Sequence, residues 1–348
     1  MNNNIRYTPE SEIDFRCNVQ LTTTEQLLLV NGVCKNVNTI VHKGFSAATG
    51  NDKKGLAFTL SAGTVIEQPL QIINVRNEED TAETIYTNTF IIEPEARIKL
   101  LICNHTLSPD VFETRSTTNI LLKENAQLEI VWMQSEHNQS RHQSEINVQQ
   151  AAGSRFSGNI IALHGAKIEN IVSIKLQGER AECVANGLFL IDKQQQYSTD
   201  ITITHEVENC RSNQLFKGVL DEQAVGRFQG RVVVAKDAQK TEAFQSNNNL
   251  LLTKQAKMFT QPQLEIYADD VKCSHGATIG QLDEQALFYF RSRGISLKEA
   301  RLLQQIGFVQ DVIDKIDILP LRERIADLVT KRLAGEFSRC ADCELHCC

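Results

Sequence analysis

The sequence predicts a mainly β protein that ends in a short helical unit. Between about residues 56 and 281, short apolar bursts alternate with polar corners, and many bursts show the period-two alternation of half-buried strands. Alanines recur at the corners, several of them about 15 or 30 residues apart. Near residue 283 the apolar spacing changes to that of amphipathic helices. These three observations define the fold class, and each segment supports it in turn.

The expected strands follow one another along the β region with corners between them. The alternation is clearest at residues 168–176 and 199–204, where most of the residues that recur with period two are β-branched. The other bursts are shorter: residues 56–60, 89–92, 98–102, 127–131, 187–191, 231–235 and 249–252. A chain of many short strands separated by similar corners is typical of a repeating β architecture.

The spacing of the corner alanines distinguishes only weakly between a β-solenoid and an antiparallel sandwich. They are Ala96, Ala126, Ala166, Ala181, Ala224, Ala238 and Ala256. The interval from Ala96 to Ala126 is twice a repeat of about 15 residues, which consists of one strand and one corner, whereas the interval from Ala126 to Ala166 does not fit. Such an irregular repeat favours a β-solenoid, in which stacked Asn and Gln ladders would explain the many amide side chains. A large antiparallel sandwich remains the alternative.

The helical signals begin after the last expected strand. A helical pattern over residues 283–290 is ended by Gly294, which suits the position just after a helix. Ser296 and Glu299 form a capping box before the next helix. That helix carries an apolar stripe: Leu302, Ile306, Val309, Ile313 and Ile316. Pro320 suits the first turn of a third helix, whose stripe is Leu321, Ile325, Leu328, Val329 and Leu333.

These signals divide the chain into four parts. We expect a polar arm over residues 1–20, a β core over 21–282, a helical domain over 283–339 and a cysteine-rich tail over 340–348. The apolar stripes of the helices are mostly core, and a minority of their residues is available to a partner.

Charge and composition exclude several functions. The 348 residues carry a net charge of −7, whereas nucleic-acid binding needs a surplus of Lys and Arg. No apolar run approaches the roughly 18 residues needed to cross a membrane. The first residues lack the apolar segment of a secretory signal and the Arg-rich character of a transit peptide. We therefore expect a cytoplasmic protein that binds neither nucleic acid nor membrane.

The ten cysteines are then reduced thiols rather than a disulfide framework. Six are scattered along the β region and the arm before it: Cys17, Cys34, Cys103, Cys183, Cys210 and Cys273. Four crowd the C-terminal tail: Cys340, Cys343, Cys347 and Cys348. Most of the scattered thiols are most simply buried apolar groups.

Common catalytic motifs are missing. The chain has no phosphate-binding loop, no dinucleotide fingerprint, no nucleophile elbow and no zinc-protease motif. A β-solenoid carbohydrate enzyme is the enzymatic alternative, and it needs a pair of carboxylates in a groove. No local arrangement in the sequence singles out such a pair.

Cys273 and His275 are the strongest candidate site. On a strand, residues two apart point to the same face, so a thiol and an imidazole would lie side by side. Both are ligands for iron, zinc or an iron–sulfur cluster, although two ligands do not complete a site. The alternative is a small buried cysteine beside a hydrogen-bonded histidine.

The segment around this pair resembles the C-terminal signature of the SufD family of iron–sulfur cluster assembly proteins. The run from Pro262 to Gly280, PQLEIYADDVKCSHGATIG, carries the resemblance, together with LFYFRSRGI from Leu287. The upstream run AQKTEAFQSNNNLLL from Ala238 also fits. The strong match covers about residues 225–316, and the β region before it fits the family in kind.

The resemblance implies a right-handed parallel β-helix core with a C-terminal helical domain. It also implies a non-catalytic scaffold that pairs with its paralogue SufB through the β-helix and binds the ATPase SufC through the helices. A transient cluster or iron would form at the SufB interface, where the family histidine maps onto His275 with Cys273 as its neighbour. Nucleotide would bind to SufC and not to this chain, and a homodimer is possible when the chain is isolated.

Four residues of the helical domain are candidate SufC contacts: Arg291, Arg293, Leu302 and Ile306. The two arginines are otherwise a solvated pair, and the two apolar residues otherwise belong to the stripe packed within the domain. Which helical residues contact SufC, the cluster type and the stoichiometry stay open.

Two features depart from the family pattern. Its N-terminal helical region is expected to be shortened or absent here, because β character begins by about residue 20 to 55. The four tail cysteines, near His346, have metal-ligand chemistry. They suggest a metal-delivery protein as a third hypothesis, and a terminus whose thiols have no specific role is the alternative.

Overall fold

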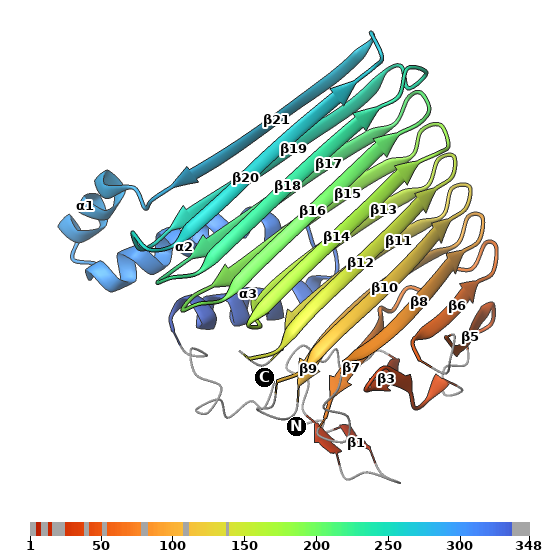
Figure 1. Ribbon diagram of the computed structural model, residues 1–348, viewed down its shortest axis with the longest axis horizontal. Helices are drawn as coiled ribbons and strands as arrows, with labels where there is room; N and C mark the ends of the chain where they lie inside the picture. The colour runs from red at the N-terminus through yellow and green to blue at the C-terminus, as the bar shows by residue number, and fades with distance from the viewer. Residues whose placement is uncertain are drawn as a thin grey trace.

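The computed structural model describes residues 5–7, 13–15, 25–37, 42–50, 54–77, 83–106, 111–136 and 139–335. Two long sheets lie face to face, and the chain passes from one to the other at every corner (Figure 1). From β6 onward the even-numbered strands belong to a nine-stranded sheet and the odd-numbered strands to a ten-stranded sheet, and neighbours within each sheet run parallel. This is a parallel β-solenoid of about seven turns followed by three helices, as predicted.

The strands of the nine-stranded sheet are β5 (Phe45–Thr49), β6 (Leu56–Leu60), β8 (Thr84–Ile92), β10 (Glu113–Leu122), β12 (Arg141–Gln150), β14 (Lys167–Leu176), β16 (Gln196–His205), β18 (Val225–Val234) and β20 (Lys257–Ile266). Those of the ten-stranded sheet are β3 (Gln26–Val30), β4 (Val33–Cys34), β7 (Leu70–Arg76), β9 (Arg97–Thr106), β11 (Gln127–Ser135), β13 (Arg155–His164), β15 (Glu182–Ile191), β17 (Arg211–Leu220), β19 (Thr241–Leu251) and β21 (Val271–Gly280). A separate antiparallel pair consists of β1 (Ile5–Tyr7) and β2 (Ile13–Phe15).

The parallel ladders overturn the antiparallel sandwich and explain the irregular alanine repeat. Gln127 pairs with Arg97 on one side and with Arg155 on the other, so the two successive turns differ slightly in length. Ala96 and Ala126 immediately precede such paired positions and lie on one edge of the solenoid. Ala166 precedes β14 and lies on the opposite edge, which is why its interval from Ala126 does not fit.

The corners on the edge of Ala96 use left-handed backbone conformations. Glu95, Asn125, Arg180 and Asn209 have φ near +60°. At the equivalent corner Gly153 has φ +66°, and a Cβ there would overlap the Asn125 side chain. Backbone hydrogen bonds link successive corners, as from Glu95 N to Glu124 O (2.9 Å). The repeat therefore satisfies its buried backbone groups from one turn to the next.

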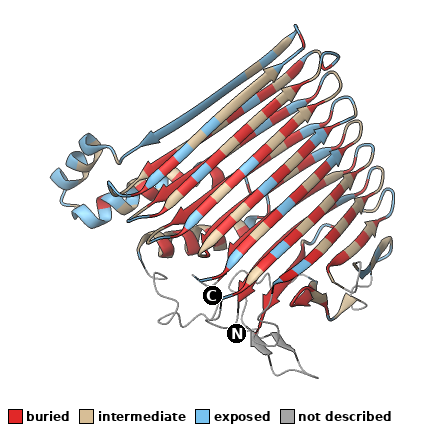
Figure 2. Cartoon of the chain, viewed as in Figure 1, coloured by how far each residue is buried: buried red, intermediate tan, exposed pale blue. Residues whose placement is uncertain are grey.

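The main core fills the space between the two sheets. Alternate residues of each strand point inward, and Figure 2 shows this as buried positions alternating with less buried ones. Amide side chains also pair between neighbouring strands, as expected from the composition. Asn74 donates to Asn104 (2.9 Å), and Asn186 donates to Asn159 (2.9 Å).

Cys34, Cys183 and Cys210 are buried free thiols, and Cys103 is buried as well. Burial raises the pKa of each of Cys34, Cys183 and Cys210, so these thiols are poor nucleophiles. Cys17 lies outside the described residues.

The three helices are α1 (Glu284–Ser292), α2 (Leu297–Ile313) and α3 (Leu319–Leu333). The capping box of Ser296 and Glu299 is present, Gly294 has φ +85° after α1, and Pro320 lies in the first turn of α3. Helices α2 and α3 cover the outer face of the ten-stranded sheet and share a second core with it (Figure 1). Val309 and Ile325 belong to this core.

Polar contacts fasten the helices to the ten-stranded sheet at three points. Lys217 of β17 donates to Phe308 O (2.7 Å) and pairs with Asp311 of α2. The Glu129 carboxylate of β11 accepts from the backbone N–H of Asp317, between α2 and α3 (2.8 Å). Arg332 of α3 pairs with Asp192 at the end of β15 (2.8 Å). These residues are far apart in sequence and form pairs because of the solenoid register.

The contact between Glu129 and Asp317 predicts that the stability of the protein depends on pH. Burial raises the pKa of Glu129 above 4.5, although the Asp317 N–H and the Lys99 charge oppose the shift. The folded state then holds a proton more tightly than the unfolded state. The stability that this tighter proton binding contributes is fully present below pH 4.5 and is lost as the pH rises through the pKa of Glu129 in the folded state. We expect Glu129→Gln to remove that loss, because glutamine keeps an acceptor for Asp317.

Urea unfolding of both proteins between pH 4 and 8 measures the effect. The stability of the variant relative to the wild type should increase as the pH rises through this window. Parallel curves for the two proteins would contradict the prediction.

Candidate functional site

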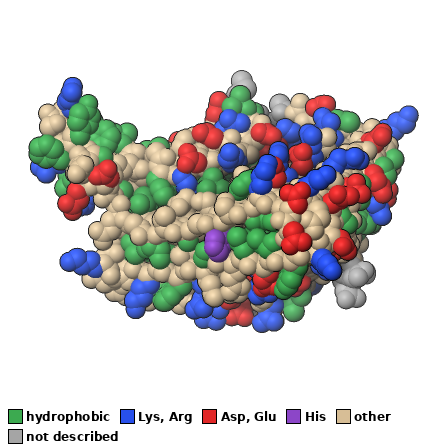
Figure 3. Space-filling model, turned by 90° about the horizontal axis from the view of Figure 1, so that it is seen from above, with side chains coloured by type: hydrophobic (Ala, Val, Ile, Leu, Met, Phe, Trp, Pro, Cys, Tyr) green, Lys and Arg blue, Asp and Glu red, His purple; other side chains and the backbone are tan. Residues whose placement is uncertain are grey.

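The C-terminal end of the solenoid is open in the described chain. Strand β21 is the last strand of the ten-stranded sheet and β20 the last of the nine-stranded sheet. Inward-facing positions that are buried in earlier turns are largely exposed in β21 (Figure 2). Figure 3 views the molecule from this side and shows a histidine among hydrophobic and uncharged groups. Both sheet edges therefore present unpaired backbone groups together with a weakly charged surface.

Cys273 and His275 lie on this last strand, as the spacing predicts. In the register of β19 and β21, Cys273 pairs with Ala243 and His275 with Gln245. Gln245 points between the sheets, where it reaches Gly230 of β18, so Cys273 and His275 face the open end of the interior. The sequence placed the two side chains on one face, and the structure places that face at the mouth of the solenoid.

The two side chains differ in exposure and chemistry. Cys273 is half-buried and packs against a small cluster that includes Val232 and Ala243. Burial raises the pKa of its thiol, while a backbone hydrogen bond involving Ala243 acts in the opposite direction. A raised pKa keeps the thiol protonated until a metal or a cationic group stabilises the thiolate. His275 is exposed and so is available to a ligand from outside the chain.

This pair supplies two ligands, and a closed metal site needs more. Within the described ranges, no group of three or more His, Cys, Asp or Glu side chains is arranged to hold a metal ion. Additional ligands would have to come from a second protein at the open end.

The candidate partner residues of the helical domain lie next to this end. Helix α1 projects beyond the strands and buries none of its side chains, leaving Phe288 75% and Tyr289 56% exposed (Figure 1). Arg291 is exposed, and the Arg293 guanidinium lies 5.2 Å from the Tyr289 ring centre. Leu302 and Ile306 on α2 are half-buried. The helix thus carries an aromatic and basic surface without an intramolecular cover among the described residues.

The tail cysteines Cys340, Cys343, Cys347 and Cys348 lie outside the described residues, as does most of the expected arm over residues 1–20.

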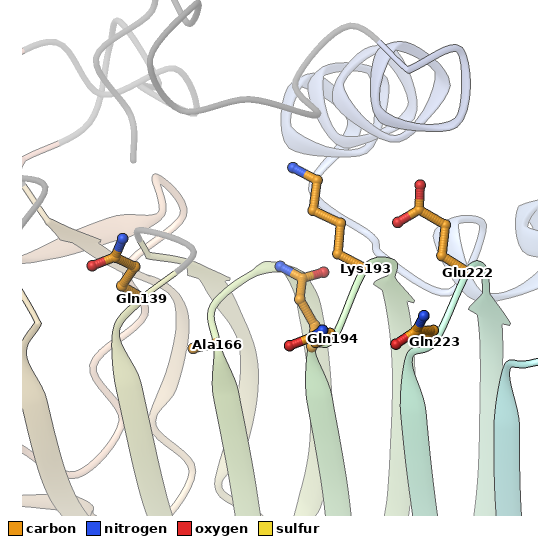
Figure 4. Close-up of a pocket in the computed structure, with 7 residues that line it drawn as sticks. Gln139, Ala166, Lys193, Gln194, Glu222 and Gln223 are labelled. Atoms are coloured by element: carbon orange, nitrogen blue, oxygen red, sulfur yellow. The ribbon is translucent and has the colours of Figure 1, made fainter.

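A groove of about 500 Å³ runs along the corners between the sheets, at the end of β15 and β17 (Figure 4). Lys193 and Glu222 project from neighbouring corners, and glutamine side chains line much of the rest. Glu222 is the one carboxylate among its described lining residues. The groove therefore does not present the acid pair that a carbohydrate enzyme requires.

The sequence analysis expected amide ladders in the solenoid but did not place a layer of buried amides below the Cys273–His275 strand. Gln214, Gln245, Asn247 and Asn249 are buried inside the last complete turns, and none of them is more than 4% exposed. The sequence signal for three of them is the polar run QSNNN from Gln245, whose alternate residues point inward on the strand. Only the strand register shows that these side chains lie beneath the site.

Together these features define the class: a two-sheet parallel β-solenoid with an open Cys-x-His end and a helical domain packed on one sheet. The model of the SUF system FeS cluster assembly SufBD core domain matches residues 74–308. The chain belongs to this SufBD family, in agreement with the resemblance seen in the sequence.

Named relatives agree with this placement. Over 221 residues the chain is 34% identical to the iron–sulfur cluster assembly protein SufD of Escherichia coli K12, covering 64% of this chain and 52% of that protein. It is 36% identical over 216 residues to a SufBD family protein of Synechocystis, covering 62% and 48%. It is 32% identical over 214 residues to the chloroplastic protein ABCI7 of Arabidopsis thaliana, covering 61% and 45%. The chain thus spans about half the length of these relatives.

None of the helices in the described ranges is both long and apolar enough to cross a membrane.

Proposed function

We propose that this chain is a non-catalytic scaffold subunit of the SufD type in iron–sulfur cluster assembly. The observation that carries the proposal is the pair of half-buried Cys273 and exposed His275 at the open end of a SufBD solenoid. Iron and sulfide, or a transient cluster, are the cargo that a thiolate and an imidazole bind together.

The partner that completes the site is a second SufBD protein. The unpaired edges of β20 and β21 suit strand-to-strand pairing with another solenoid, which would bring further ligands to His275. We propose that SufB is this partner and that two copies of the chain can pair in the same way when SufB is absent.

The helical domain is proposed to bind the ATPase SufC. The exposed Phe288 and Tyr289, with Arg291 and Arg293 beside them, provide the aromatic and basic groups that are enriched at protein interfaces. Leu302 and Ile306 would contribute from α2. Nucleotide would bind to SufC and not to this chain. Dimerisation of SufC would then move the helical domains and open the interface between the solenoids to cargo.

The domain division belongs to the same proposal. The core over residues 21–282 would pair with SufB, and the domain over 283–339 would bind SufC. The arm over 1–20 and the tail over 340–348 have no role in this scheme, and the expected location is the cytoplasm.

His275→Ala tests the proposal. Because a direct ligand would be lost, we expect the complex with SufB and SufC to form at least about tenfold less cluster, since even the loss of an outer-shell partner typically costs that much. Visible absorbance and acid-labile sulfide per complex measure the cluster.

His42→Ala is the matched control, because His42 is also exposed but lies near the other end of the solenoid. Both variants should still co-purify with the two partners. Wild-type cluster yield from the His275→Ala complex would remove His275 from the site, and failure of the wild-type chain to bind either partner would refute the scaffold assignment.

A further inference from the structure

A row of side chains on successive strands of the ten-stranded sheet runs along the interior of the solenoid and ends at His275. The strand registers place Ala185 beside Gln214, Gln214 beside Gln245, and Gln245 beside His275. The first of these positions is apolar, like most of the core, and the next two are glutamines. Gln214 is fully buried and Gln245 is 4% exposed. Burying two amides in an apolar core is unfavourable unless their hydrogen bonds are satisfied.

The Gln245 amide is in contact with two neighbouring strands. Its Nε2 donates to Gln214 Oε1 in the turn below (3.1 Å). Gly230 on the opposite sheet leaves the space that this amide occupies, because a Cβ at that position would overlap Gln245 Nε2. The side chain is therefore fixed both along the solenoid and across it.

This orientation leaves an unused acceptor next to the candidate site. Gln245 Oε1 is buried and has no hydrogen-bond partner among the described residues. Since the amide nitrogen is used by the turn below, the oxygen is the group left for the turn above. The residue paired with Gln245 in that turn is His275, on a strand about 4.8 Å away.

We propose that Gln245 is a positioning residue for His275, an inference that rests on the proposed function. When His275 binds its cargo through one ring nitrogen, the N–H of the other ring nitrogen donates to Gln245 Oε1. This bond satisfies the buried acceptor and sets both the tautomer and the ring orientation of the histidine. Histidines that bind metals almost always have such a partner, which also makes the ligating nitrogen more basic.

The competing explanation is that Gln245 only stabilises the amide layer. Asn247 and Asn249 belong to the same strand, and Asn249 donates to Asn247 Oδ1 (2.7 Å). Asn247 pairs with Ala277 rather than with His275. Asn247→Leu therefore disturbs the layer without removing the acceptor next to the histidine, and it is the matched control for Gln245→Met.

The test uses zinc ions, in zinc-buffered solutions, as a probe of the full chain. NMR of 15N-histidine-labelled protein reports the tautomer and the metal ligation of each histidine ring. The signal that disappears in His275→Ala is assigned to His275. Zinc bound by thiols elsewhere in the chain therefore does not contribute to the measured affinity. We expect Gln245→Met to weaken zinc binding at His275 by about tenfold and to leave a mixture of tautomers. Gln245→Glu, which retains an acceptor, should restore a single tautomer and most of the affinity, and Asn247→Leu should resemble the wild type.

Two results would overturn the inference: equal zinc affinity and tautomer in Gln245→Met and the wild type, or equal losses in Gln245→Met and Asn247→Leu. Because the readout needs no assembled complex, it separates this inference from the proposed function. If His275→Ala forms normal clusters while Gln245→Met loses zinc affinity, the proposed function fails and the positioning role stands.

Discussion

Replacing Arg332 with leucine is expected to lower the free energy of unfolding by about 3 kcal/mol and to loosen α3 from the ten-stranded sheet. The Arg332 side chain is 6% exposed and pairs with Asp192 at 2.8 Å. Its Nε donates to Leu163 O, and an Nη donates to Gln195. The substitution would leave the Asp192 charge, which is 17% exposed, without its partner. That residual exposure places the cost at the lower end of the range for broken buried pairs.

The pH dependence identifies this mechanism. Burial raises the pKa of Asp192, but the hydrogen bond and charge of Arg332, together with Lys193 and His164, outweigh burial, so the net pKa lies below 3.8. The contribution of the pair is present above pH 3.8 and is lost as the pH falls through the folded pKa. The difference between wild type and Arg332→Leu should therefore shrink in strong acid.

Urea unfolding and hydrogen exchange of the α3 amides measure this prediction. The double variant Arg332→Leu/Asp192→Asn removes both charges and should recover most of the lost stability. Arg324→Leu is the control on the same helix, because Arg324 forms a more exposed pair with Asp327 and should cost less than about 1 kcal/mol. A similar loss in Arg324→Leu and Arg332→Leu would show that the burial of the ion pair does not matter.

Phe216→Ala is expected to lower the free energy of unfolding by about 3–5 kcal/mol. The side chain is 1% exposed, and its ring centre lies 4.9 Å from that of Phe228 on the opposite sheet. Gly187, its partner on β15, leaves the space for this ring, since a Cβ there would overlap Phe216. Because Gly187 has no side chain, it cannot fill the cavity left by the truncation.

The control for this variant lies on the next strand. Phe244 of β19 faces outward and is 39% exposed, so Phe244→Ala should cost much less than Phe216→Ala. Urea unfolding followed by circular dichroism compares the two. Equal losses would mean that the ring of Phe216 is not packed between the sheets as described.

The repeating elements were largely predictable, because their signals are local. Strand alternation depends on side chains two apart, and the capping box of Ser296 and Glu299 depends on residues three apart. The sequence distinguished only weakly between a solenoid and a sandwich, because the alternation of apolar and polar residues has the same period in parallel and antiparallel sheets. The alanine spacings mixed two edges of the solenoid, and only the ladders separate Ala126 from Ala166.

The candidate site was predicted in part for the same reason. Cys273 and His275 share a face by spacing alone, and the surrounding motif indicated the family. The spacing did not show that this face lies at the open end of the last turn. Gln245 was missed because it lies a whole turn before His275 along the chain, and only the register of β19 and β21 makes them neighbours. The aromatic surface of α1 was missed because its exposure depends on what packs against it.

By itself, the sequence determined the periods of the strands and helices, the helix ends and the pairing of a thiol with an imidazole on one strand. These properties arise within a few residues of one another and need no knowledge of distant partners. The tertiary structure decided which corners stack, which buried amide lies beneath His275 and which charges fasten α3 to the sheet. Those choices depend on the lengths of successive turns, which set the register between stacked strands, and on the packing between the sheets.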